Sequence, residues 1–119
     1  MGIVNVRGLI GADQEHLQEV EFLVDTGSLY TFVTPEMARR LGVAATTTSR
    51  VVMADGRTTE VGVAAAYLRL MDREGGVIVG IMGVPFPILG VTSLEILGLK
   101  VNPVEEVLEH ARPFGPAAL

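Results

Sequence analysis

Asp25 is the residue of this sequence best placed to do chemistry, because it ends an apolar run and is followed at once by Thr26, Gly27 and Ser28. A second, mostly apolar cluster at residues 29–33 begins immediately afterwards. Burying an ionised carboxylate without partners costs several kcal/mol. Asp25 is therefore either a turn residue that caps its own loop or a carboxylate that the fold holds in place for acid–base catalysis.

Other residues able to do chemistry are few and scattered. Cysteine is absent, which excludes disulfides, thiol nucleophiles and cysteine-based metal sites. His16 and His110 lie far apart without a second ligand pattern, so we expect both to be solvated surface residues and expect neither a metal nor a cofactor. The remaining aspartates are predicted turn residues: Asp13, Asp55 and Asp72.

The composition is that of a small, slightly acidic globular domain. Of 119 residues, 49% are hydrophobic and 19% are charged, which is enough apolar material for a modest core. Fourteen acidic and nine basic residues give a net charge of −5 without a Lys/Arg cluster, which argues against nucleic-acid and anionic membrane partners. We expect one domain over residues 1–110 and a flexible tail over residues 111–119.

Targeting and membrane signals are not visible in the sequence. The N-terminus lacks the basic and apolar regions of a signal peptide. The uncharged stretch 76–92 is short for a membrane span and contains Pro85 and Pro87. We therefore interpret that stretch as buried strands and expect a cytoplasmic protein with no membrane partner.

The elements that must position Asp25 follow from local patterns in the first half of the chain. Residues 2–10 and 17–24 predict a strand hairpin that leads into Asp25. Thr34 as N-cap and Gly42 as stop predict a short helix between them. Residues 46–54 and 57–70 predict a second hairpin whose turn is Asp-Gly.

The second half of the chain continues the β pattern. We predict a turn over 72–76, a strand over 77–82 that is buried on both faces, and a short strand over 88–90. A Ser/Thr-capped helix over 92–98 and a last strand over 101–108, bent at Pro103, complete the chain. The expected fold is mainly β, a barrel or folded-over sheet with one or two short helices.

The sequence resembles the retropepsin-like aspartic proteases, which are single-lobe, homodimeric members of clan AA. Asp-Thr-Gly alone is a weak signal, since it arises by chance in roughly one chain of this size in a hundred. However, "FLVDTGSLYTFVTPEMARRLG" is similar to the family's catalytic loop, and "FPILGVTSLEILGLKV" is similar to its second signature. The resemblance covers residues 2–108 and implies a closed β-barrel of the acid protease fold. In that fold Ile88, Leu89 and Gly90 pack beneath the catalytic loop.

The resemblance also implies a mechanism and a partner. Aspartic proteolysis uses two carboxylates that share one proton, and only Asp25 precedes Thr-Gly here. The second carboxylate is then expected from another copy of the chain, in a two-fold homodimer that hydrolyses a peptide or protein substrate. By the same resemblance Thr26 braces the two loops across the dimer, and Gly27 offers its carbonyl to the substrate backbone.

Two further expectations concern the surroundings of Asp25. By resemblance, the second hairpin is a flap that closes over substrate, the alternative being an ordinary surface hairpin; its tip residues are Met53, Ala54, Asp55, Gly56 and Arg57. From the residues themselves, the Ser28 hydroxyl is expected to donate to the ionised carboxylates and lower their apparent pKa values. Ser28→Ala is then expected to move the pH–activity profile upward.

Two other classes of function remain open at this point. One is a non-catalytic dimerisation or peptide-binding module that retains the retropepsin fold, since a fold does not guarantee activity. The other is an unrelated small β-barrel binding protein with a chance Asp-Thr-Gly. An Asp25→Asn variant tests the first alternative, and a monomer in solution favours the second.

Overall fold

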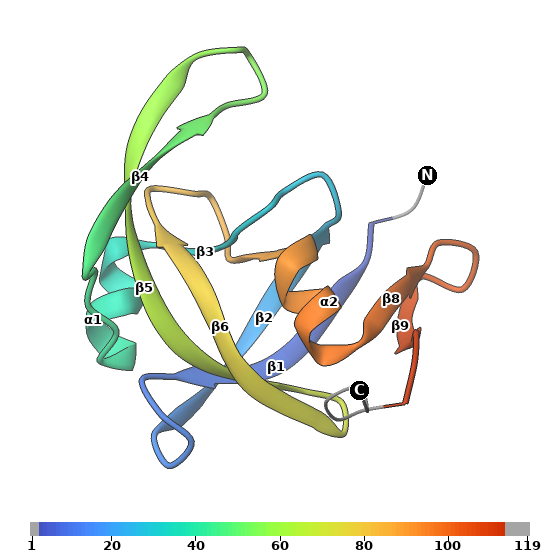
Figure 1. Cartoon of the computed structure of the whole chain (residues 1–119). Helices are drawn as coiled ribbons and strands as arrows, with labels where there is room; N and C mark the ends of the chain where they lie inside the picture. Colours follow the sequence, from blue (N-terminus) through green and yellow to red (C-terminus); the bar gives the residue numbers. More distant parts are fainter. Residues whose placement is uncertain (1–2, 114–119) are drawn as a thin grey trace, which may run out of the picture.

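The structure is a computed structural model that describes residues 3–113 (Figure 1). Within that range the chain forms nine strands and two short helices. In chain order they are β1 (Asn5–Gly11), β2 (Leu17–Asp25), β3 (Thr31–Val33), α1 (Pro35–Leu41), β4 (Thr47–Val52), β5 (Thr58–Leu70), β6 (Arg73–Ile81), β7 (Ile88–Gly90), α2 (Val91–Leu97), β8 (Leu99–Asn102) and β9 (Val107–His110). Neither helix has the length and hydrophobicity that spanning a bilayer requires.

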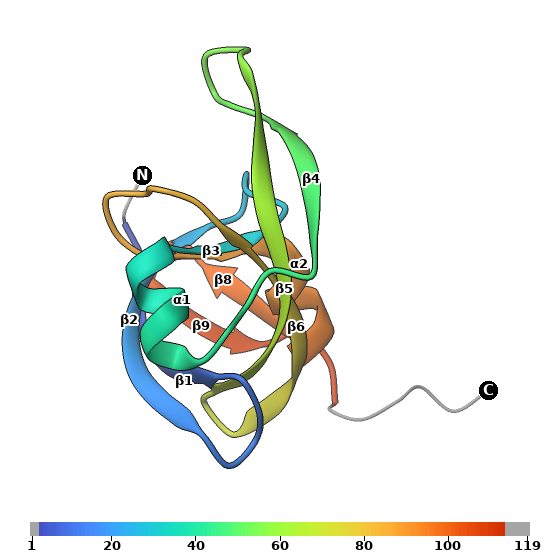
Figure 2. The same cartoon turned by 90° about the vertical axis from the view of Figure 1, so that its left-hand side faces the viewer.

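Six of these strands close into a barrel, which confirms the mainly β, closed-barrel prediction. Their order around the barrel is β1-β2-β7-β3-β6-β5, and β5 returns to β1 through the antiparallel pairs from Leu9↔Arg69 to Gly11↔Tyr67. Strand β4 pairs with the outer part of β5, and the two extend beyond the barrel as a long hairpin (Figure 2). The barrel therefore leaves one hairpin free to cover a neighbouring surface.

The core is the inside of this barrel. Alternate residues of the strands point inward, as the period of two requires. Burial of each large apolar side chain contributes about 1.5–3 kcal/mol. The side chains with 0% exposure include Ile10, Phe22, Leu68, Val79 and Leu89. Leu89 belongs to the short strand next to Asp25, so the core reaches directly beneath that residue.

Helix α1 forms as the sequence predicts. The Thr34 hydroxyl accepts a hydrogen bond from the Met37 N–H at 3.1 Å, and Pro35 occupies the first helical position. Gly42 ends the helix in the left-handed region at φ +74°, where glycine avoids the strain that a Cβ causes. Both boundaries are predictable because they depend on neighbouring residues alone.

Helix α2 differs at its start. It begins at Val91 with Gly90 as the N-cap, and within the described residues no side chain caps it. The predicted Ser/Thr cap is wrong because the Ser93 hydroxyl points into the core, where it hydrogen-bonds with Thr31 at 2.6 Å. The predicted stop at Gly98 is confirmed, at φ +66°.

The predicted turn over 72–76 is also wrong in extent. Only residues 71–72 form the turn, and β6 already begins at Arg73, which pairs with Leu70. A hydrogen bond of 3.0 Å from Arg69 Nε to Glu74 supports the extension across the two strands. Ile78 is 49% exposed, so β6 alternates in burial and is not covered on both faces.

The predicted strand over 101–108 is two strands. β8 and β9 form a separate antiparallel hairpin, with Pro103 in the turn between them. The Asn102 side-chain oxygen accepts hydrogen bonds from the N–H groups of Val104 and Glu105, at 3.1 and 3.0 Å, and so bends the chain. Most of the predicted tail, residues 114–119, lies outside the described residues.

Candidate active site

Asp25 is positioned by the strand that carries it and by the strand beside it. It is the last residue of β2, whose final three residues pair in parallel with β7. The register joins Leu23 to Ile88, and Asp25 to Gly90. Strand β7 continues on its other side to β3, through the pair Phe32↔Ile88. The loop 26–30 thus leaves β2, passes over β7 and returns as β3.

Ile88, Leu89 and Gly90 form strand β7, which pairs with the strand that ends at Asp25. Leu89 is completely buried, and the N–H of the following residue, Gly90, donates to the Thr31 hydroxyl at 3.0 Å. The N–H of Val91 donates to the Ser28 carbonyl at 2.8 Å. These bonds fix the loop to β7 and to the first turn of α2.

Only glycine fits at position 90. A Cβ added there lies 2.2 Å from the Tyr30 carbonyl oxygen and 2.8 Å from that of Ser28. Both atoms belong to the backbone, so neither can move without displacing the loop. The glycine of the second signature is therefore required by the close approach of the Asp25 loop.

The Asp25 side chain lies at the open edge of the core and is itself exposed, as are Thr26 and Gly27. Its Oδ1 accepts the Gly27 N–H at 2.9 Å, and its carbonyl accepts the Ser28 N–H at 3.0 Å. Within residues 3–113, Oδ2 makes no hydrogen bond. One carboxylate oxygen of this exposed side chain is thus held by the loop.

Ser28 does not make the contact that the sequence suggested. Its hydroxyl donates to the Tyr30 carbonyl at 2.8 Å, and a hydroxyl has only one proton to donate. The proton is therefore directed along the loop rather than to Asp25, so the expected hydrogen bond from Ser28 to the carboxylate is not made.

Thr31 and Ser93 are site residues that sequence reasoning missed. Their side chains are 0% and 1% exposed, and their hydroxyl oxygens are 2.6 Å apart. Thr31 Oγ1 also accepts the Gly90 N–H, so the pair connects β3, β7 and α2 beneath the loop. The available signal was a hydroxyl residue within each mostly apolar segment, because a buried hydroxyl must find a hydrogen-bond partner.

Tyr30 connects the loop to the long hairpin. Its hydroxyl donates to Ser49 Oγ on β4 at 3.2 Å. Its ring meets Phe32 edge to face, with centroids 5.9 Å apart. The end of the Asp25 loop and the base of the hairpin are therefore in direct contact.

The predicted flap residues form the tip of that hairpin. The Met53 N–H donates to the Arg57 carbonyl at 2.7 Å, and Gly56 turns the chain at φ +87°. The Arg57 N–H and its Nε donate to the Asp55 carboxylate at 3.0 and 2.7 Å. These two bonds, the backbone one first, lower the pKa of Asp55. Ala54 completes the turn.

Asp13 and Asp72, the two other aspartates outside the hairpin tip, lie in turns of their own. Asp13 and Asp72 are turn residues as predicted, and each lies 2.7 Å from a histidine, His16 and His110 respectively. The histidine hydrogen bond is the main cause that lowers the pKa of each carboxyl. Both histidine side chains are solvated, as expected, at 76% and 45% exposure. Within the described part of the chain, no cluster of three or more acidic or histidine residues is arranged to hold a metal.

Comparison with known proteins agrees with this geometry. A closed barrel whose Asp-Thr-Gly loop is supported by an Ile-Leu-Gly strand defines the retropepsin-like class of aspartic proteases. The sequence profile of the family described as aspartyl protease matches residues 4–101. The chain therefore belongs to the aspartyl protease family, and its fold and family support a protease-like function.

A solved structure shows the same fold. The protease of EIAV, in complex with the inhibitor HBY-793, matches with a TM-score of 0.64 and 21% identity, over 85% of this chain and 93% of that chain. At this identity the likeness establishes the fold alone, and it confirms the retropepsin-like fold class. No curated protein sequence matches the chain.

Proposed function

We propose that this protein is an aspartic endopeptidase that acts as a homodimer, with one active site formed by Asp25 and the partner's Asp25. The observation that carries the proposal is a single Asp-Thr-Gly loop, held rigidly over β7, with its carboxylate exposed at the surface. An exposed carboxylate on a loop this well fixed is positioned for use rather than for stability.

The chemistry requires a second carboxylate. Two carboxyl groups a few ångströms apart share one proton, so that one acts as base and the other as acid. Asp13, Asp55 and Asp72 all occupy turns with partners of their own. A second copy of the chain supplies the missing group most simply, on a two-fold axis.

The reaction follows from that pair. A water held between the two carboxyls attacks the scissile carbonyl as the ionised Asp25 takes its proton. The protonated partner donates to the carbonyl oxygen as negative charge develops there. As the family resemblance implies, Gly27 offers its carbonyl to the substrate backbone, while its N–H remains bonded to Asp25. Thr26, exposed beside them, braces the two loops against each other.

Exposed apolar side chains support a face that a second copy covers. Leu29, in the Asp25 loop, is 63% exposed, and Val104 and Val107 of the β8–β9 hairpin are 86% and 48% exposed. Among the described strands, β8 and β9 pair only with each other, so each leaves an unpaired edge. Unpaired edges and exposed apolar residues are features of interfaces.

The β4–β5 hairpin acts as the flap in this proposal. It projects from the barrel (Figure 2), and its base contacts the Asp25 loop through Tyr30 and Ser49. Closure over a bound peptide excludes water from the carboxyl pair and strengthens its electrostatic interactions.

The test is incubation with a diverse peptide mixture from mildly acidic to neutral pH, with cleavage mapped by mass spectrometry. Wild type and Asp25→Asn are compared, and the oligomeric state is measured on the same samples by sedimentation. We expect a dimer whose cleavage disappears in Asp25→Asn. Equal cleavage by both proteins contradicts the proposal, and peptide binding by both without cleavage indicates a non-catalytic peptide-binding module.

A further inference from the structure

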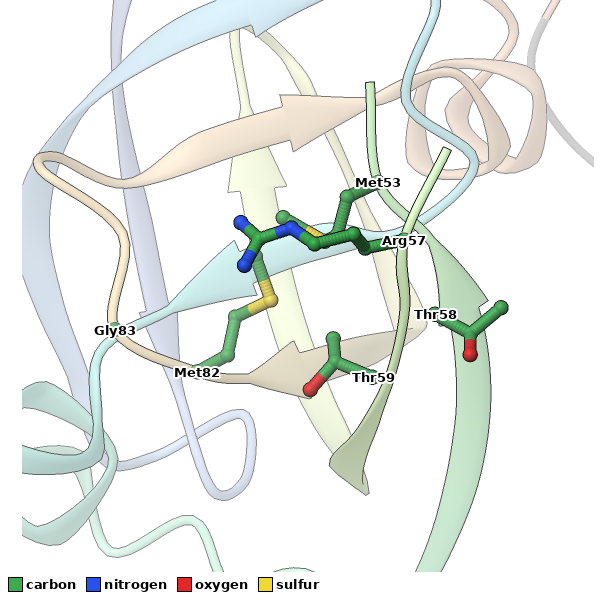
Figure 3. Close-up of a pocket in the computed structure, with 6 residues that line it drawn as sticks. All are labelled: Met53, Arg57, Thr58, Thr59, Met82 and Gly83. Carbon is green, nitrogen blue, oxygen red and sulfur yellow. The ribbon is translucent and has the colours of Figure 1, made fainter. Parts of the chain in front are cut away.

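A cavity of about 330 Å³ lies between the tip of the β4–β5 hairpin and the end of β6 (Figure 3). Its lining residues come from both elements: Met53, Arg57, Thr58, Thr59, Met82 and Gly83. Known ligand pockets of about 300–1,000 Å³ hold whole small molecules. A cavity at the low end of that range suits one side chain of a peptide rather than an extended segment.

The strand register places Arg57 on the cavity side of the hairpin. Val51 pairs with Thr59 and Val52 with Thr58, and the Met53 N–H to Arg57 carbonyl bond continues the ladder. Paired residues share a face and successive residues alternate. Met53, Arg57 and Thr59 therefore share one face, whereas alternation places Thr58 on the other face with Val52, although Thr58 also contributes to the cavity lining.

The close-up agrees with this register. The Arg57 side chain extends from the hairpin toward the end of the Met82 side chain, and the Met53 side chain overlaps Arg57 in this view (Figure 3). Methionine is flexible and polarizable, so it adapts to different side-chain shapes. The walls combine the two flexible methionine side chains with two threonines, and the charge in the cavity comes from Arg57.

The guanidinium retains capacity to bind an anion. Its Nε donates to Asp55 at 2.7 Å, but within residues 3–113 its two Nη atoms make no hydrogen bond. The side chain is 81% exposed and so accessible to an arriving peptide. The two Nη atoms match the two oxygens of a carboxylate.

We propose that this cavity is a specificity subsite that selects an acidic side chain, Glu or Asp, of the peptide substrate through Arg57. The inference rests on the proposed peptidase function and names the substrate feature that its cleft prefers. The chain's net charge of −5 disfavours acidic peptides at long range, but exposed charges are screened beyond about 8 Å at physiological salt. Arg57 acts at contact distance, where its attraction for an acidic side chain outweighs the screened repulsion from the net charge of the chain.

Arg57→Gln removes the charge that is proposed to bind the acidic side chain. Two further variants of the hairpin are informative. Asp55→Asn removes the carboxylate that competes for the guanidinium, while its amide oxygen still accepts the Arg57 N–H. Arg50→Gln is the matched control, because Arg50 pairs with Glu60 and alternation puts it on the face opposite Arg57. It removes the same charge from the same hairpin without touching the cavity.

The experiment uses a peptide series in which each position around a cleaved bond carries Glu, Gln or Lys in turn. For wild type we expect kcat/KM to favour Glu over Gln by about threefold to tenfold at one position. The Glu-to-Gln ratio falls to about one in Arg57→Gln, rises in Asp55→Asn and is unchanged in Arg50→Gln. An absent preference in wild type, or one that persists in Arg57→Gln, overturns the inference.

A binding measurement separates this inference from the proposed function. Peptides with a reduced, uncleavable bond are titrated into Asp25→Asn, alone and combined with Arg57→Gln, and affinities for the Glu and Gln versions are compared. If wild type cleaves nothing but Asp25→Asn binds the Glu peptide better in an Arg57-dependent way, the peptidase proposal fails and the subsite stands. If affinities for the two versions are equal, the subsite is refuted whatever the cleavage result.

Discussion

At the scale of single residues, the central observation is that the Asp25 carboxylate is exposed rather than buried. The carboxylate follows an apolar strand, yet it is exposed, and one oxygen is fixed by the Gly27 N–H. Folding of the single chain therefore does not incur the desolvation penalty of burying this charge. Any burial of Asp25 must come from a second molecule, which is why the dimer is central to the proposed function.

Ser28 provides a residue-scale prediction. Because its hydroxyl donates to the Tyr30 carbonyl, Ser28→Ala is expected to leave the midpoints of the pH–activity profile unchanged. It should lower the free energy of unfolding by about 1 kcal/mol, the usual net contribution of one hydrogen bond. Activity across pH and urea unfolding measure the two effects. An upward shift of the acidic midpoint contradicts this assignment and indicates that the Ser28 hydroxyl donates to Asp25 instead.

At the scale of elements, the support of the Asp25 loop by β7 depends on Gly90. Gly90→Ala forces a Cβ into two backbone carbonyls, and we expect it to destabilise the fold by about 3 kcal/mol or more. Gly76→Ala is the matched control, since a Cβ at that strand glycine meets nothing within 4 Å. Thermal unfolding of both variants checks the comparison. Equal stabilities for the two contradict the packing argument.

The contact between β9 and the β5–β6 turn predicts a pH dependence. The hydrogen bond from His110 is the main cause that lowers the pKa of Asp72 from its ordinary 3.8. A carboxyl whose pKa is lower in the folded than in the unfolded state stabilises the fold at pH values above its unfolded-state pKa. That contribution is lost as the pH falls through the folded-state pKa.

Asp72→Asn tests this linkage. The stability difference between wild type and variant should be complete above about pH 4–5 and shrink toward zero as the solution is acidified to about pH 2. Urea unfolding over that range measures it. A difference that is independent of pH indicates a purely structural role for the carboxyl.

The elements also differ in how far the sequence alone predicts them. Helix α1 and the Asp55-Gly56 turn are predictable because capping and turn chemistry involve residues next to one another. Ser93 is mistaken for a cap because its partner, Thr31, is distant in the sequence. In the sequence, the segment that forms the β8–β9 hairpin resembles a single strand. Its turn depends on the Asn102 side chain, which gives little local signal.

At the scale of the whole molecule, the sequence predicts the Asp25 loop and the strand next to it, but not the surface that a second copy would cover in the proposed site. The Asp-Thr-Gly and Ile-Leu-Gly segments are sufficient to identify the loop and the strand that supports it. The cavity at Arg57 depends on the register between β4 and β5 and on the end of β6, which are long-range features. The proposed dimer depends on a surface and therefore does not follow from strand patterns.

The proposed interface makes its own prediction. Val104→Asp places a charge on a side chain that is 86% exposed and that the second copy is expected to cover. Burial of an unpaired charge is costly, so dimer dissociation should increase and activity should fall most at low protein concentration. Met71→Asp, at an exposed turn residue, is the control. Sedimentation profiles that are identical for the two variants contradict this interface.

The most direct test of the account mixes wild type with Asp25→Asn under conditions that let subunits exchange, at constant total concentration. If each active site needs Asp25 from two chains, random pairing predicts that activity follows the square of the wild-type fraction, so an equal mixture retains about a quarter of full activity. Activity that follows the wild-type fraction linearly, retaining about half in an equal mixture, shows that one chain suffices and contradicts the shared carboxyl pair.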